Sequence, residues 1–96
     1  STRVYLESGD ASIDAEDRQR IADMAQSARS SDRAVAITGY TDQTGDEAGN
    51  ADLARDRATA VRDALLNEGL EEGRIVMDPP KVLTDEEAER VDIDMR

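Results

Sequence analysis

Asp42 and Arg57 carry opposite charges at the two ends of one strand–loop–helix segment. The run from Ile37 to Tyr40 is typical of a strand, and periodic apolar residues resume only at Leu53, so a polar loop separates strand from helix. A carboxylate and a guanidinium held near each other can bind a ligand that has both an amine and a carboxylate. The segment therefore predicts a two-charge binding site.

Arg57 is predicted to face the core of the domain. It lies four residues after Leu53 and four before Val61, and residues at that spacing share one face of a helix. A charged side chain in such a place either reaches the surface at the edge of the core or forms a pair. A plain salt bridge with Asp42 is therefore the structural alternative to a ligand site, and Asp42 alone would also suit a turn.

The rest of the chain predicts the elements that hold this segment in place. Asp14 suits a helix N-cap, with Asp17 in the capping-box position; Asn50 suits the cap of a second helix, and Gly69 its left-handed end. The predicted elements are a strand at 3–7, a helix from 14 to about 29, a strand at 34–40, a helix from 50 to about 68, a strand at 74–77, a helical turn at 84–88 and a strand at 91–95. The inward residues of the second helix are predicted to be Leu53, Ala60, Val61, Ala64 and Leu65.

This order predicts one α+β domain that spans residues 1–96. Its arrangement is a two-layer β-α-β-α-β-β sandwich, with two helices packed on one face of a four-stranded mixed sheet. In the last strand apolar residues alternate with Asp92 and Asp94, a pattern that predicts one face in water.

The composition excludes several classes of function. The net charge is −11, from 23 acidic and 12 basic residues, which argues against binding nucleic acid or anionic lipid. Cys and His are both absent, so thiol chemistry, a disulfide framework, a Ser–His triad and the usual zinc ligands are excluded. We expect no cofactor and no metal.

No apolar run approaches the ~20 residues of a membrane span, and no signal peptide is recognisable at the start. If the protein is exported, this chain is expected to be a mature form or one domain of a longer protein. The acidic surface favours a soluble monomer, and adaptation to a salty medium is the alternative that composition alone does not separate from it.

A longer pattern surrounds the charged pair and extends from residue 34 to 76. Its members are Gly39-Tyr40-Thr41-Asp42, Gly45, Asn50, Leu53-Ala54, Arg57-Ala58, Val61, Leu65, Gly69 and Arg74-Ile75. In order, spacing and residue type the pattern resembles the OmpA-like (OmpA/MotB) peptidoglycan-binding domain family.

The resemblance implies that the domain binds the stem peptide of peptidoglycan, in particular its meso-diaminopimelate. Asp42 matches the family's aspartate and would accept the ammonium group, and Arg57 matches the arginine that would bind a carboxylate. The ligand-binding residues implied in this way are Asp42, Arg57, Thr41, Tyr40, Thr44, Asn50, Leu53 and Arg90. The resemblance further implies a periplasmic domain that anchors an outer-membrane protein or lipoprotein of a Gram-negative bacterium to the cell wall, with no membrane contact of its own.

Departures from the family pattern leave a second reading open. Tyr40 replaces the common histidine and Ala54 the usual serine, while Ala88-Glu89-Arg90 stands where Asn-Arg-Arg is usual. Arg90 keeps the second arginine of that motif, but Glu89 reverses a charge. A structural or assembly domain with weak or lost peptidoglycan binding is therefore the alternative.

Acidic clusters supply two less favoured readings. The adjacent acids Glu71-Glu72 and Glu86-Glu87 could be imagined as hydrolytic carboxylates, although neighbouring acids usually point apart into solvent. Asp42, Asp46 and Glu47 could bind calcium, but the EF-hand spacing is absent. The expected function is non-catalytic.

Overall fold

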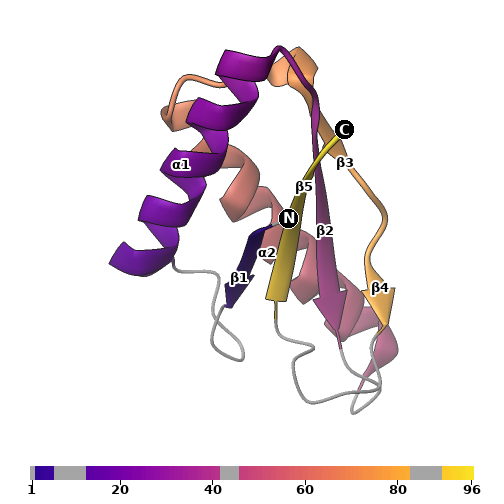
Figure 1. Cartoon of the computed structure of the whole chain (residues 1–96). Coiled ribbons are helices and arrows are strands. Elements are labelled where there is room, and N and C mark those ends of the chain that lie inside the picture. The colour runs from indigo at the N-terminus through magenta and orange to yellow at the C-terminus, as the bar shows by residue number, and fades with distance from the viewer. Residues whose placement is uncertain (1, 6–12, 42–45, 83–89) are drawn as a thin grey trace.

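The computed structural model describes residues 2–5, 13–41, 46–82 and 90–96, which form two helices packed on one face of a mixed sheet (Figure 1). The elements are β1 Thr2–Tyr5, α1 Ala15–Ser31, β2 Val35–Thr41, α2 Glu47–Asn67, the 3₁₀ helix η1 Glu72–Arg74, β3 Ile75–Met77, β4 Lys81–Val82 and β5 Arg90–Met95. The predicted α+β fold is confirmed. The helical turn predicted at 84–88 lies outside the described residues.

The sheet has the strand order β1-β5-β2-β3, with β5 antiparallel to both β1 and β2 and β3 parallel to β2. A fifth strand, β4, which the sequence did not predict, pairs in parallel with the end of β2. Pro79 and Pro80 lie between β3 and β4 and have no N–H to donate, which explains why the ladder along β2 is interrupted there. Two residues are too few to show an alternating pattern in the sequence.

Helix α1 begins where the sequence predicted. The side chain of Asp14, its N-cap, accepts a hydrogen bond of 2.9 Å from the backbone N–H of Asp17. Helix α2 begins earlier than predicted, because its cap is Asp46, whose side chain accepts from the N–H of Ala48. Asn50 lies inside the first turn of α2. The predicted cap at Asn50 is therefore wrong, because Asp46 caps the helix one turn earlier.

Gly69 directly follows Glu68, the C-cap of α2, and has a φ of 93°, the left-handed conformation that the sequence predicted for it. None of the described helices is both long enough and apolar enough to cross a membrane.

One hydrophobic core fills the space between the helices and the sheet. Its buried members are Val4, Ile21, Met24, Ala25, Ala28, Val35, Ile37, Ala58, Val61, Leu65, Leu70, Val91 and Ile93. Helix α2 turns Ala54, Arg57 and Ala58 fully inward, whereas Leu53 is only half-buried, contrary to the prediction. The reason is that α2 crosses β2 closely and presents its small residues to the strand.

The last strand differs from its prediction in one respect. Asp92 was expected in water but is buried, with 7% of its surface exposed. Because β5 lies between β1 and β2 in the sheet, side chains from the neighbouring strand and from β5 itself cover it: Arg3 lies 4.0 Å and Arg90 3.1 Å from its Oδ1.

Candidate ligand-binding site

Three predicted site residues, Tyr40, Thr41 and Arg90, lie on strand ends at the same end of the sheet, the lower end in Figure 1. Tyr5, the last residue of β1, pairs with Arg90, the first residue of β5. Tyr40 and Thr41 end β2, and Gly39 beside them pairs with Val91. Helix α2 begins at the same end (Figure 1). The topology therefore gathers strand ends and a helix start that are far apart in the sequence.

Arg57 is a buried charged residue on helix α2. Only 2% of its surface is exposed, and it lies in the inward stripe of α2 between Ala54 and Val61, both with no exposed surface. Its predicted inward position is confirmed. A buried guanidinium is costly unless carboxylates or other acceptors neutralise it, so this place favours an anionic partner.

The close crossing of α2 over β2 sets where Arg57 lies. A Cβ added to Gly39 would come within 2.4 Å of the carbonyl oxygen of Ala54, so a larger residue would push the helix away. Side chains alternate along β2, and Ile37 lies in the core; Thr41, 9% exposed, therefore faces the same helical layer as Arg57. Glycine at 39 and alanine at 54 are thus what bring the helix against the end of the strand.

Tyr40 and Arg90 lie on the other side of the sheet. We call this the outer face; it is the face opposite the helices and carries Arg3, Thr38, Tyr40, Arg90 and Asp92. The guanidinium carbon of Arg90 lies 4.8 Å from the centroid of the Tyr40 ring. Its Nε lies 3.1 Å from Asp92 Oδ1, as an ion pair rather than an aligned hydrogen bond. The sheet therefore separates Arg57 and Thr41 from Tyr40 and Arg90.

The remaining predicted ligand-binding residues are less well placed or lie outside the described residues. Asn50 and Leu53 are half-buried on the first turns of α2, at the same end of the sheet as Thr41. Asp42 and Thr44 lie outside the described residues, so their roles in binding stay predictions from the sequence.

The acidic alternatives find little support in the residues described. Glu71 and Glu72 are exposed at the start of η1, and Glu86-Glu87 lie outside the described ranges. Asp46 is used as the cap of α2. Within 2–5, 13–41, 46–82 and 90–96 no group of three Asp, Glu, His or Cys is arranged to hold a metal ion.

Asp92 is the residue that sequence reasoning missed. It lies two residues after Arg90 on β5, and residues at that spacing point to the same face of a strand. That signal was available in the sequence, but the alternation of Asp92 with apolar residues led to the prediction that Asp92 faces water. The central place of β5 makes it a buried partner of Arg90 instead.

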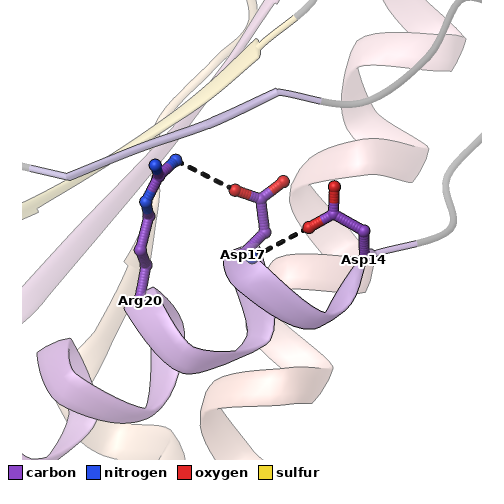
Figure 2. A network of polar contacts seen from close by, with 3 residues as sticks. All are labelled: Asp14, Asp17 and Arg20. Atoms are coloured by element: carbon purple, nitrogen blue, oxygen red, sulfur yellow. Dashed lines mark hydrogen bonds and ion pairs between the residues drawn. The ribbon is translucent and has the colours of Figure 1, made fainter.

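A second polar cluster lies at the start of α1 (Figure 2). Asp17 is buried, with 4% exposed, and its Oδ1 lies 3.2 Å from Nη1 of Arg20. Burial of the carboxyl raises the pKa of Asp17, the nearby charge of Asp14 adds to the rise, and Arg20 opposes it. Asp17 is the first of the buried residues along α1, which are Asp17, Ile21, Met24, Ala25 and Ala28.

The chain is similar to one protein family in sequence and to several solved structures in fold. The family model described as "OmpA family" matches residues 5–90. No curated protein matches the chain. The structure of the peptidoglycan-associated lipoprotein from Burkholderia pseudomallei is similar at 25% identity and a TM-score of 0.84, covering 100% of this chain and 91% of that one.

Two further solved structures share the fold at lower identity. The OmpA-like domain of FopA1 from Francisella tularensis has 22% identity and a TM-score of 0.81, with 98% of this chain and 72% of that one covered. The C-terminal domain of MotB from Helicobacter pylori has 16% identity and a TM-score of 0.80, with 100% and 84% covered.

Proposed function

The chain belongs to the OmpA family, and we propose that it is a non-catalytic domain that binds peptidoglycan. The observation that carries the proposal is Arg57, a guanidinium with 2% of its surface exposed on the inward face of α2, which matches the arginine of the family pattern. The similarity to a peptidoglycan-associated lipoprotein over 100% of this chain supports the same assignment.

The ligand we propose is the stem peptide, recognised at its meso-diaminopimelate. Arg57 binds a carboxylate of that residue and Asp42 accepts its ammonium group, while Thr41, Thr44 and Asn50 line the site. Each charge-assisted hydrogen bond contributes about 1.5–3 kcal/mol when it is partly desolvated. Two such contacts give a weak single-site affinity, which many copies on one polymeric wall raise through avidity.

The same relatives support a proposal for the host system. We propose that the domain lies in the periplasm as a monomer and anchors an outer-membrane protein or lipoprotein to the cell wall. The support is that one similar structure is a peptidoglycan-associated lipoprotein and that others are periplasmic domains of MotB.

Pull-down by purified sacculi tests the proposal. Arg57→Met keeps the length of the buried side chain but removes the charge, and its retention on sacculi is expected to fall at least about tenfold. Arg55→Ala is the matched control, since Arg55 lies on the same helix, is exposed and pairs with Asp52, and its loss changes the net charge equally. Circular dichroism checks that both variants are folded.

Titration with a stem peptide identifies the group that is recognised. A peptide that contains diaminopimelate is expected to shift the amide signals of Thr41 and Asn50, and a peptide with lysine in its place to bind more weakly because it lacks the second carboxylate. Retention of Arg57→Met on sacculi at the level of the unmodified protein would refute the proposal. It would favour the alternative of a structural domain that has lost its ligand, for which the net charge of −11 is the supporting observation.

A further inference from the structure

We propose that Arg90, Asp92 and Tyr40 form a positioning network on the outer face of the sheet, which fixes the end of β2 and thereby the ligand site on the opposite face. The inference rests on the proposed function, because it assigns these residues a role in the same site. It makes Tyr40 and Arg90 positioning residues that act through the strand.

The network is built around the guanidinium of Arg90. One contact is to the ring of Tyr40, at 4.8 Å from its centroid, and another is the ion pair of Nε with Asp92 Oδ1 at 3.1 Å. Arg90 and Asp92 each expose only 7% of their surface. A cation held between an aromatic ring and a carboxylate in a place shielded from water interacts with both more strongly than it would at an exposed site.

The contact between Tyr40 and Arg90 lies where it can hold the end of β2 against β5. The described backbone ladder between β2 and β5 extends from Val35 paired with Met95 to Gly39 paired with Val91. Tyr40 comes after the last of these pairs on β2, and Arg90 comes before it on β5. Their side-chain contact therefore continues the attachment of β2 to β5 for one residue beyond the ladder, on the side away from β4.

Holding Tyr40 also holds its neighbour. Thr41 follows Tyr40 and points to the other face, towards the layer that contains Arg57. A shift of the β2 end would move Thr41 relative to α2, which packs closely against Gly39 two residues earlier on the strand. The network on one face thus sets the spacing of groups on the other face.

Four single variants and one double variant test this by their affinity for a diaminopimelate-containing stem peptide. Tyr40→Phe keeps the ring face, and Arg90→Lys keeps a cation over it, so both are expected to bind within about twofold to threefold of the unmodified protein. Tyr40→Leu and Arg90→Met remove one half of the contact, and each is expected to weaken binding about 5- to 30-fold. The double variant Tyr40→Leu/Arg90→Met should be no weaker than the weaker single variant.

Chemical shifts of the ligand-free protein provide a readout that needs no ligand. The amide signal of Thr41 is expected to move in Tyr40→Leu and Arg90→Met and to return close to its original place in Tyr40→Phe and Arg90→Lys. Equal loss of affinity in Tyr40→Phe and Tyr40→Leu would overturn the proposal, since it would show that the hydroxyl group contacts the ligand directly.

The two proposals fail in different ways. If Arg57→Met abolishes binding while Tyr40→Leu binds normally and leaves Thr41 unmoved, the network is refuted and the ligand site stands. If Arg57→Met binds sacculi normally, the proposed function is refuted, and the Thr41 signal in the ligand-free variants still decides whether the network positions the strand.

Discussion

The two faces of the sheet each bury an arginine, but in opposite surroundings. On the helical side Arg57 is the exception, a charge within a stripe of alanine, valine and leucine side chains. On the outer face Arg90 is one of several charges, with Asp92 and Arg3 beside it and the ring of Tyr40 against it. The same residue type at similar burial therefore lies in different surroundings.

The difference separates the two roles that a buried arginine can have. Arg90 is surrounded by groups of its own sheet that oppose or stabilise its charge, so its surroundings suit a role in holding strands together. Arg57 lies on the inward face of α2 among apolar side chains, at the position that matches the family's carboxylate-binding arginine, and this place suits a residue whose charge serves a ligand. Burial alone would not have distinguished them.

Truncating one residue on each face of the sheet tests how much the two faces differ in their contribution to stability. Ile37→Ala removes a fully buried side chain between the sheet and the helices and is expected to lower the free energy of unfolding by about 3 kcal/mol. Val76→Ala, on the neighbouring strand with 38% of the residue exposed, should cost less than about 0.5 kcal/mol. Denaturant titration measures both, and equal losses would show that the faces do not differ.

The crossing that places Arg57 can be disturbed at Gly39. Gly39→Ala puts a methyl group against the carbonyl of Ala54 and is expected to destabilise the protein by about 1–3 kcal/mol. Gly73→Ala is the matched control, because its Cβ would meet nothing within 4 Å, and it should be neutral or slightly stabilising. A Gly39→Ala protein as stable as the control would contradict the close crossing.

The helical layer can be loosened at its first turn. Asp14→Ala removes the side chain that caps α1 and is expected to cost about 1 kcal/mol, whereas Asp14→Ser keeps an acceptor and should cost much less. Thermal unfolding of the two variants side by side measures the difference. If both lose the same stability, the cap does not contribute, and the start of α1 is held by packing alone.

The smallest effect is expected from Asp17, the buried carboxyl of the helical layer. Its pKa is raised above the ordinary value of 3.8, so between 3.8 and the raised value the folded protein keeps a proton that the unfolded chain has lost. Stability contributed by this group therefore falls as pH rises through that window and is constant above it.

Asp17→Asn isolates this contribution, because the amide does not titrate. The stability of Asp17→Asn relative to the unmodified protein is expected to increase with pH from about 3.8 upward and then to level off. Urea titrations at a series of pH values measure it. A relative stability that decreases over the same range would mean that Arg20 outweighs burial and lowers the pKa.

Much of the fold could be predicted because short-range sequence patterns determine where its helices and longer strands lie. Apolar spacing marked both helices and the longer strands, Asp14 and Gly69 marked a start and an end, and periodicity placed Arg57 inward. These signals depend on residues within a few positions of one another, so a sequence displays them directly.

The parts that could not be predicted all depend on neighbours distant in the chain. The two-residue β4 exists only because the end of β2 offers it a partner. Asp92 is buried because β5 lies between β1 and β2, although its pattern is that of a strand with one wet face.

The sequence by itself determined which residues are available for a two-charge site and that Arg57 points inward, because helical periodicity is a local property. Only the tertiary structure decided that Arg90 and Tyr40 lie across the sheet from Arg57, joined to each other and to Asp92. The physical reason is that strand order and register are set by packing the whole sheet against its helices, and these determine which side chains share a face.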